Sequence, residues 1–343
     1  RRRGCLRGGL RGGRKQPLTG AHPGRDCVYR VAMGEAVLIV GHDADALAKL
    51  VCASEPDLDL TFAGNAREAL DGYAGQRILF GNPQAVAEAL PEMPDVQWVQ
   101  STWAGVSPLL SMHRRDYVLT GVKGVFGGPV SDYVMAYVLA HETRLLERLG
   151  RQAHRDWWPE DSNSPASKTM GIMGTGSIGR HLAGVAAAFG MGVIGLSRSG
   201  RAIDAFEAVY PVERLREFLS RADYVVSTLP ETNETQDLLA QDAIATMKPG
   251  AYLVNVGRGT VLDEKALLDA LEKGRLAGAV LDVFRQEPLP PENPLWHAPN
   301  CIVTAHIAAR SRPAGIAAIF RENYERFLRG ESLNYRVDID RGY

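Results

Sequence analysis

Two histidines near the carboxyl end of the chain are candidates for moving protons. His297 and His306 lie nine positions apart in the segment HAPNCIVTAHIAA. A histidine side chain changes its charge near neutral pH, so it can donate or accept a proton during a reaction. An isolated histidine is more often an ordinary polar side chain than a catalyst. The residues around each histidine must therefore decide between the two.

Three charged or titratable residues follow three consecutive predicted strands. Arg258 stands between two glycines just past one strand, Glu287 closely follows the next, and His306 ends the third. In parallel sheets, ligands bind beyond the carboxyl ends of the strands. The three side chains are therefore predicted to converge at one site. His297 precedes its strand, at the opposite edge, and is predicted to be an exposed loop residue.

A glycine-rich turn lies earlier in the chain, in the segment MGIMGTGSIGRHLA. Gly174, Gly176 and Gly179 form a GxGxxG pattern directly after a predicted strand and directly before a predicted helix. Gly174 permits the tight turn, Gly176 lets the backbone approach a pyrophosphate, and Gly179 lets the helix pack on the strand. The helix N-terminus attracts the anion. This context predicts a dinucleotide-binding site.

The end of the next predicted strand indicates which dinucleotide is bound. NAD sites usually place an acidic residue there, but this chain has Ser197, Arg198 and Ser199, followed closely by Arg201. A carboxylate would repel a 2′-phosphate, whereas a guanidinium pairs with one. NADP(H) is therefore the expected cofactor. NAD(H) remains possible if the two arginines are only solvated surface charges.

Strand and helix patterns alternate along most of the chain, from Ala36 onward, which predicts an α/β fold with parallel sheets covered by helices. The segments DADALAKLVCA and NPQAVAEAL have helical patterns between the first strands. Six strands with intervening helices in the second block fit a complete doubly wound dinucleotide fold. The strands are expected over 36–41, 58–64, 77–81, 96–102 and 117–122 in the first block, and over 169–174, 192–197, 223–230, 251–257, 277–284 and 301–306 in the second.

Two further helices suggest how the domains are divided. Residues 129–150 form one helical pattern that starts at a proline and stops at a glycine, and 313–335 form an amphipathic helix with a tail. The polar segment 151–168 between the two blocks contains Trp157 and Trp158, which are expected to pack on something. Two doubly wound domains are predicted: a disordered basic extension over 1–33 precedes a discontinuous substrate-binding domain over 34–132 and 313–343, and a Rossmann NAD(P)-binding domain spans 133–312.

Composition limits the possible partners. The 343 residues are 45% hydrophobic and carry a net charge of −1. Residues 1–33 have eight arginines and one lysine against one aspartate, so subtracting +8 from −1 leaves −9 for the remainder. An acidic body argues against nucleic acid as the main partner. The basic segment is interpreted as a disordered extension upstream of a natural start at Met33, with an organelle-targeting segment as the alternative.

The sequence has neither a membrane-spanning pattern nor a cysteine pattern typical of a metal or disulfide site. No apolar run approaches the roughly 18 residues that a membrane span needs. The four cysteines (Cys5, Cys27, Cys52 and Cys301) have no metal-ligand spacing, and nothing in their number suggests a disulfide framework. We therefore expect reduced thiols, no bound metal, and a cytoplasmic protein.

Taken together, these motifs are similar to those of a known enzyme family. It resembles the D-isomer-specific 2-hydroxyacid dehydrogenases, particularly the NADPH-linked glyoxylate/hydroxypyruvate reductase branch. The likeness runs over residues 36–335. It is densest in GIMGTGSIG, STLPETNETQDLL, MKPGAYLVNVGRGTVLDEKALLDAL, LDVFRQEPLPPENPLW and IVTAHIAA.

The resemblance implies a flavodoxin-like substrate domain, a homodimer formed through the long helix and the loop after it, and roles for matching residues. Arg258 would bind the substrate carboxylate and keto oxygen, His306 would be the general acid–base, and Glu287 would hold its imidazole. The backbone amides of Ala104 and Gly105 would also bind the substrate. The cofactor would contact Gly174, Gly176, Ser177, Ile178, Gly179, Ser197, Arg198, Ser199, Leu229, Pro230, Thr235, Val256, Gly257 and Asp282.

The expected activity follows from these roles. A small 2-keto acid such as glyoxylate or hydroxypyruvate would be reduced to the D-2-hydroxy acid by hydride transfer from NADPH, with His306 as the general acid. The alternative is an NAD(P)-sensing interaction protein with little turnover, like the corepressor relatives of this family. The presence of Arg258, Glu287 and His306 favours the enzyme, because a sensor needs none of them.

Overall fold

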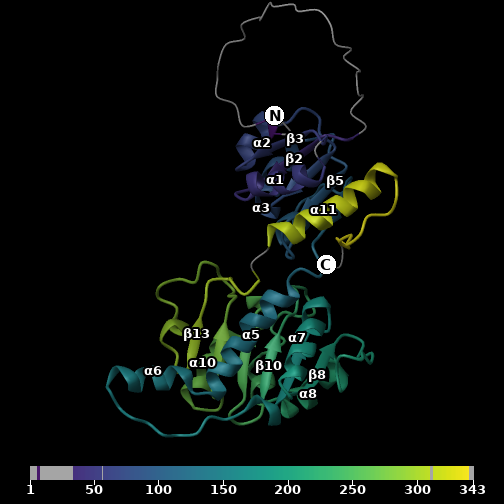
Figure 1. Ribbon diagram of the computed structural model, residues 1–343. Coiled ribbons are helices and arrows are strands. Elements are labelled where there is room, and N and C mark those ends of the chain that lie inside the picture. The colour runs from purple at the N-terminus through teal and green to yellow at the C-terminus, as the bar shows by residue number, and fades with distance from the viewer. Residues whose placement is uncertain (1–5, 8–33, 56, 310–311, 340–343) are drawn as a thin grey trace, which may run out of the picture. The chain divides into compact units, whose positions relative to one another are not determined.

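The structure is a computed structural model in which the chain forms two compact units (Figure 1). The first comprises Arg1–Val125 and Ser311–Tyr343, and the second comprises Phe126–Arg310. The segment after the last strand of the second unit thus belongs to the first. The structure describes residues 6–7, 34–55, 57–309 and 312–339.

The first unit is built on a parallel sheet in the order β3-β2-β4-β5-β6, with β1 added beside β3. Leaving β1 aside, this is the flavodoxin-like strand order, as predicted. Apart from β1, residues 1–33 lie outside the described part of the chain, so the disordered extension stays a prediction. The strands are β1 (Leu6–Arg7), β2 (Val37–Val40), β3 (Leu60–Ala63), β4 (Ile78–Gly81), β5 (Trp98–Ser101) and β6 (Val118–Thr120).

Two helices of the first unit, α2 and α3, begin at asparagines whose side chains cap the first turn. The Asn82 side chain accepts from the Gln84 amide at 2.8 Å at the start of α3, directly after β4. The ring of Phe320 on α11 stacks on Phe80 and Trp98 of the sheet, which ties the final helix to this unit. The helices are α1 (Ala44–Ser54), α2 (Ala66–Gly72), α3 (Pro83–Ala89), η1 (Leu90–Glu92), α4 (Ser107–Leu110) and α11 (Pro313–Leu328).

The second unit contains a fully parallel seven-stranded sheet in the order β13-β12-β11-β10-β7-β8-β9. This is the doubly wound dinucleotide order extended by one strand, and it confirms the predicted fold. The strand that extends this order is β13, beside β12, whereas β9 takes the third place of the order. Strand β9 was not predicted, because its four residues end in a proline. The strands are β7 (Thr169–Met173), β8 (Gly192–Ser197), β9 (Ala208–Pro211), β10 (Tyr224–Ser227), β11 (Tyr252–Asn255), β12 (Gly278–Leu281) and β13 (Cys301–Val303).

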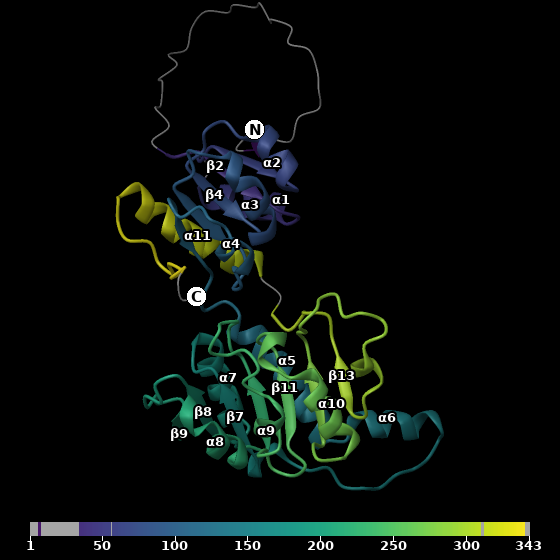
Figure 2. The same cartoon turned by 180° about the vertical axis from the view of Figure 1, so that it is seen from behind.

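Helices cover both faces of this sheet, as Figures 1 and 2 show from opposite sides. The helices α5 (Gly127–Glu142) and α7 (Ser177–Ala188) pack together on one face. On the other face, α8 (Leu215–Arg221), α9 (Gln241–Ile244) and α10 (Glu264–Glu272) share one apolar core with the strands. Short turns of 3-10 helix complete the unit: η2 (Pro165–Ser167), η3 (Val212–Arg214), η4 (Gly259–Val261) and η5 (Pro294–His297).

The prediction of one continuous helix over 129–150 was wrong. The chain forms α5 and then α6 (Leu145–Ala153), separated at Arg144, whose φ is +53°. The side chain of Glu142, at the end of α5, is buried and accepts a short hydrogen bond from the hydroxyl of Tyr224 in the sheet. Because α5 is anchored there, the chain turns at Arg144 and α6 leaves the sheet with no buried residue.

Two general expectations can be compared with the described residues. Cys301 is a free, partly buried thiol, but Cys52 is disulfide-bonded, so the expectation that all four thiols are reduced was wrong for Cys52. Number and spacing of cysteines alone do not reveal such a bond. No helix in the described part of the chain is both long and apolar enough to cross a membrane.

Candidate active site

The glycine-rich turn between β7 and α7 has the geometry of an anion cradle. Gly174 has a φ of +104°, and a Cβ on Gly179 would lie 2.0 Å from the Gly174 carbonyl oxygen. These two positions therefore require glycine. A Cβ on Gly176, by contrast, would meet no atom within 4 Å, so the backbone there faces open space.

The positive end of α7, with its first backbone amide groups, faces that open space. Gly176 is the N-cap, no side chain caps the helix, and its first turn has no acidic residue. Ser177 and Ile178, which begin the helix, are not buried. The first amide groups of this 12-residue helix are thus available to an anion. A dinucleotide pyrophosphate fits this cradle.

The turn after β8 carries the residues expected to meet the cofactor ribose. Ser197 accepts a hydrogen bond from the Gly200 amide at 3.1 Å, and Gly200 has a φ of +61°. No carboxylate stands on this strand end; instead the guanidinium of Arg198 pairs with Glu234, which belongs to the loop after β10. Glu234 was not identified from the sequence, because nothing in its spacing linked it to Arg198.

The loops after β10 and β11 approach each other closely. A Cβ on Gly257 would lie 2.7 Å from the carbonyl oxygen of Leu229, so these backbones touch. The neighbouring Thr235 donates a hydrogen bond to the carbonyl of Pro230 at 2.7 Å, closing its own loop. Leu229, Pro230, Val256 and Gly257, expected to border the cofactor, therefore lie together at the carboxyl edge of the sheet.

The backbone at Arg258 is fixed by Asn255, a residue that was not identified from the sequence. The fully buried side chain of Asn255 donates to the Arg258 carbonyl at 3.0 Å and accepts from the Gly257 amide at 3.2 Å. Burial lowers the pKa of the Arg258 guanidinium, and the carboxylates of Glu231 and Glu287 oppose this shift. An arginine remains charged at neutral pH despite such a shift, so Arg258 is a fixed cation for an anionic ligand.

His306 and Glu287 form a directly hydrogen-bonded pair. The Nδ1 atom of His306 lies 2.8 Å from Oε2 of Glu287, and Oε1 of Glu287 accepts from the Phe284 amide at 2.9 Å. Burial raises the pKa of Glu287, but the hydrogen bonds from His306 and Phe284 and the charges of His306 and Arg258 lower it more. The carboxylate is therefore ionised at neutral pH and fixes the orientation of the imidazole.

Asp282 holds the backbone around His306. This carboxylate is 1% exposed; it accepts from Thr304 Oγ1 at 2.5 Å and from the amides of Ile307 and Ala308, each at 2.8 Å. Its backbone carbonyl accepts from the His306 amide at 2.8 Å. His306 itself has a φ of +52°, an uncommon conformation that these bonds maintain. Thr304 was also missed; its signal was a polar residue directly after an apolar strand.

The remaining sequence candidates belong to other segments of the chain. Ala104 and Gly105 follow β5 in the first unit, and neither amide donates a hydrogen bond to a described residue. His297 is an exposed residue at the end of η5, before β13. Within the part of the chain that the structure describes, no group of three or more acidic, cysteine or histidine side chains is arranged to hold a metal.

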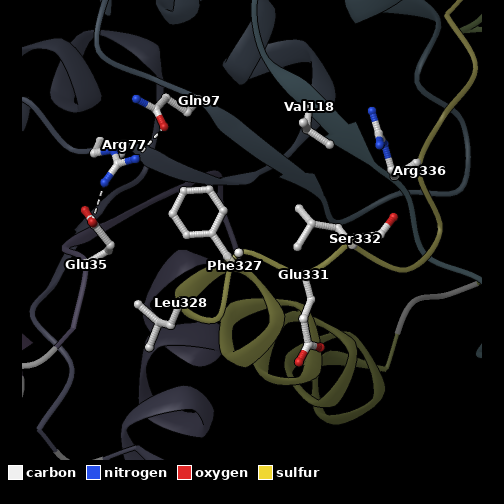
Figure 3. Close-up of a pocket in the computed structure, with 11 residues that line it drawn as sticks. Glu35, Arg77, Gln97, Val118, Phe327, Leu328, Glu331, Ser332 and Arg336 are labelled. Carbon is white, nitrogen blue, oxygen red and sulfur yellow. Dashed lines mark hydrogen bonds and ion pairs between the residues drawn. The ribbon is translucent and has the colours of Figure 1, made fainter.

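A separate cavity in the first unit does not share this chemistry. It has a volume of about 450 Å³ and lies at the amino ends of β4 and β5 (Figure 3). The Arg77 guanidinium at its wall already pairs with Glu35, donates to Gln97 at 2.6 Å and lies over the Phe327 ring. The Arg77 guanidinium is therefore engaged within the fold, and we assign the active site to the sheet edge of the second unit and not to this cavity.

Comparisons with known proteins agree with this geometry. The family model described as "D-isomer specific 2-hydroxyacid dehydrogenase, NAD binding domain" matches residues 135–308. A curated relative, glyoxylate/hydroxypyruvate reductase A of Serratia proteamaculans, is 37% identical over 214 residues, which cover 62% of this chain and 68% of the relative.

Solved structures show the same likeness over nearly the whole chain. A D-isomer specific 2-hydroxyacid dehydrogenase family protein from Aeromonas salmonicida is 40% identical, with a TM-score of 0.85 over 90% of this chain and 100% of that one. An NADPH-dependent glyoxylate/hydroxypyruvate reductase from Sinorhizobium meliloti is 29% identical, with a TM-score of 0.80 and the same coverage. The chain therefore belongs to the D-isomer specific 2-hydroxyacid dehydrogenase family and is an NAD(P)-dependent oxidoreductase of its glyoxylate/hydroxypyruvate reductase-like branch.

Proposed function

We propose that this enzyme reduces a small 2-keto acid of the glyoxylate or hydroxypyruvate type to the D-2-hydroxy acid, with NADPH as the preferred hydride donor. The observation that carries this proposal is the His306–Glu287 hydrogen bond of 2.8 Å at the sheet edge that also carries Arg258. A proton donor, its ionised partner and a fixed cation are the groups that reduction of a 2-keto carboxylate requires.

The cofactor would occupy the second unit along the carboxyl edge of its sheet. Its pyrophosphate would lie on the cradle at Gly176, Ser177 and Ile178, and a 2′-phosphate would meet Arg198 and the hydroxyl groups of Ser197 and Ser199. Relatives support this choice: the Sinorhizobium meliloti reductase was solved with NADP, and a relative from Xanthobacter autotrophicus was solved with NADPH. NADH remains a usable donor in this proposal.

The nicotinamide end would be bordered by Val256 and Gly257. Asp282 would accept from the carboxamide, because among the described residues its Oδ2 accepts one hydrogen bond, from the Ala308 amide. When bound, the nicotinamide supplies the hydride that reduces the keto carbon. Every other task falls to the side chains and backbone amides of the protein.

His306 would protonate the oxygen that becomes the hydroxyl group. Its Nδ1 faces the ionised Glu287, so Nε2 is the atom left to donate a proton. The proton passes from Nε2 to the keto oxygen as the carbon receives its hydride, and the imidazolium becomes neutral imidazole. Glu287 favours the protonated imidazole before the step by charge attraction.

Arg258 would bind the substrate carboxylate and offset negative charge on the keto oxygen. A carboxylate binds a guanidinium through two parallel hydrogen bonds, which would orient the adjacent carbonyl.

Steady-state kinetics test this proposal directly. Purified protein should oxidise NADPH with glyoxylate or hydroxypyruvate, and a panel of 2-keto acids scored by kcat/KM would rank the substrates. NADPH should give a higher kcat/KM than NADH. Absence of turnover across the panel would overturn the activity, and a preference for NADH would overturn the choice of cofactor.

We also propose that the enzyme is a homodimer formed through α6 and the loop after it. Helix α6 exposes Leu145, Leu146 and Leu149, and Trp157 in the following loop is 91% exposed. Figure 1 shows α6 extending from the edge of the second unit. An apolar face of this kind on a projecting helix is typical of a protein–protein interface.

A further inference from the structure

The guanidinium expected to meet a 2′-phosphate is already paired with a carboxylate. Nε of Arg198 lies 2.9 Å from Oε2 of Glu234. The two residues come from different loops, one after β8 and one after β10. Their side chains are 56% and 64% exposed, so incoming ligands can reach both charges.

The loop that carries Glu234 is closed by its own hydroxyl groups. Thr235 Oγ1 donates to the Pro230 carbonyl at 2.7 Å and accepts from the Thr232 amide at 3.0 Å. These bonds span the residues on both sides of Glu234. The Glu234 carboxylate is therefore carried by a turn whose backbone is fixed by hydrogen bonds.

The loop that carries Arg198 is equally well defined. Ser197 Oγ accepts from the Gly200 amide at 3.1 Å, and Ser199 pairs with Pro211 of β9 in an isolated bridge. Gly200 packs so closely that a Cβ would lie 2.7 Å from the Pro211 ring. The backbone on both sides of Arg198 is therefore fixed, and its guanidinium is positioned to pair with Glu234.

We propose that Glu234 is a specificity-determining residue that limits the preference of this enzyme for NADPH over NADH. The inference rests on the proposed cofactor site and adds a residue to it. Glu234 supplies, from a different loop, a carboxylate of the kind that the end of β8 lacks. A 2′-phosphate must share Arg198 with this carboxylate, whereas a 2′-hydroxyl meets no like charge and can donate to it.

Electrostatics gives the direction of the effect. A phosphate dianion bound to Arg198 lies within a few ångströms of Glu234, and like charges at that distance repel. The pair is exposed, so water and salt weaken the repulsion. We therefore expect the Glu234→Gln variant to bind 2′-phosphorylated ligands about 3–10-fold more tightly. Binding of ligands without that phosphate should stay the same or weaken.

The test uses two adenosine ligands that differ only in the 2′-phosphate. Adenosine 2′,5′-bisphosphate and adenosine 5′-monophosphate are titrated by calorimetry into the wild type and the Glu234→Gln variant, at low and at high salt. Glu213→Gln is the matched control, because Glu213 is an exposed glutamate near β9 in the same unit. The same variants are then compared by kcat/KM for NADPH and NADH.

The supporting result is that the Glu234→Gln variant binds the bisphosphate, and not the monophosphate, more tightly than the wild type does. This difference in Kd should be smaller at high salt, and the Glu213→Gln variant should bind both ligands as the wild type does. An unchanged or weaker Kd for the bisphosphate would overturn the inference. So would an equal gain for both ligands.

These outcomes are separable from failure of the proposed function. If the wild type does not bind the bisphosphate more tightly than the monophosphate, the NADPH site itself is wrong. If the wild type prefers the bisphosphate but the Glu234→Gln variant shows no change, only the role of Glu234 is wrong.

Discussion

His306 and Glu287 are joined by a 2.8 Å hydrogen bond between Nδ1 and Oε2, and the second oxygen of the same carboxylate is held by a backbone amide. Glu287 therefore cannot rotate freely to follow the imidazole. The ring is oriented by a carboxylate that is itself positioned. In the proposed mechanism this arrangement leaves Nε2 of His306 to donate the proton, and it gives rise to the first two predictions.

Replacing His306 with alanine should remove the proton donor while leaving the cofactor cradle intact. We expect the kcat/KM for the keto acid to fall by about 10²–10⁴-fold. The Kd for NADPH, measured by fluorescence titration, should stay close to that of the wild type. His297→Ala is the matched control and should retain full activity. Full activity of His306→Ala would contradict the proposed role.

Acidification should weaken the contribution of Glu287 to stability. The pKa of Glu287 is lowered in the folded protein from an ordinary value of 4.5, so the unfolded state takes up the proton first as the pH falls. The stabilisation is present above pH 4.5 and is lost as the pH falls through the folded-state pKa. Urea midpoints of wild type and Glu287→Gln, measured from pH 7 to pH 3, should converge. A constant difference over this range would contradict the prediction.

Two glycines in one helix should respond oppositely to alanine. At Gly179 the new Cβ would lie 2.0 Å from the Gly174 carbonyl oxygen, so the turn must shift and we expect a loss of about 1–3 kcal/mol. At Gly184, also in α7, it would meet no atom within 4 Å, and we expect a gain of about 0.4–1 kcal/mol. Urea denaturation of both variants measures the difference. Equal effects would show that α7 does not pack on the turn as described.

The exposed leucines of α6 should control assembly. We expect the wild type to be dimeric in light scattering, and the Leu146→Asp/Leu149→Asp double variant to be monomeric because charge is placed on the apolar face. Leu328→Asp, at an exposed leucine on α11, should remain dimeric. A monomeric wild type, or a dimeric double variant, would contradict the proposed interface.

Much of the second unit could be predicted because its signals are local. The GxGxxG turn stands between a strand and a helix in the sequence itself, and the strands around it are continuous apolar runs. Arg258, Glu287 and His306 each follow such a strand, so parallel topology alone brings them to one edge. The structure places Glu287 and His306 in direct contact.

What could not be predicted depends on contacts between distant segments. The helix over 129–150 breaks at Arg144 because Glu142 pairs with Tyr224, about eighty residues later in the chain. The Arg198–Glu234 pair joins two loops whose spacing follows no periodic pattern. Asn255 and Asp282 were predicted inside strands, and Asp282 as a cofactor contact, but the sequence did not show that their side chains hydrogen-bond the backbone of the segments that carry Arg258 and His306. Propensity and periodicity do not encode such pairings.

The exposure of Trp157 makes this side chain an optical reporter of the molecule. At 91% exposure its indole emits as it would in water and is open to collisional quenchers, whereas Trp98 is fully buried and shielded from them. Iodide quenching therefore separates these two emitters in a variant whose other three tryptophans, Trp103, Trp158 and Trp296, are replaced by phenylalanine. If the α6 face is covered in the assembled enzyme, dilution should restore the quenchable emission, and the intrinsic fluorescence would then report the dissociation constant.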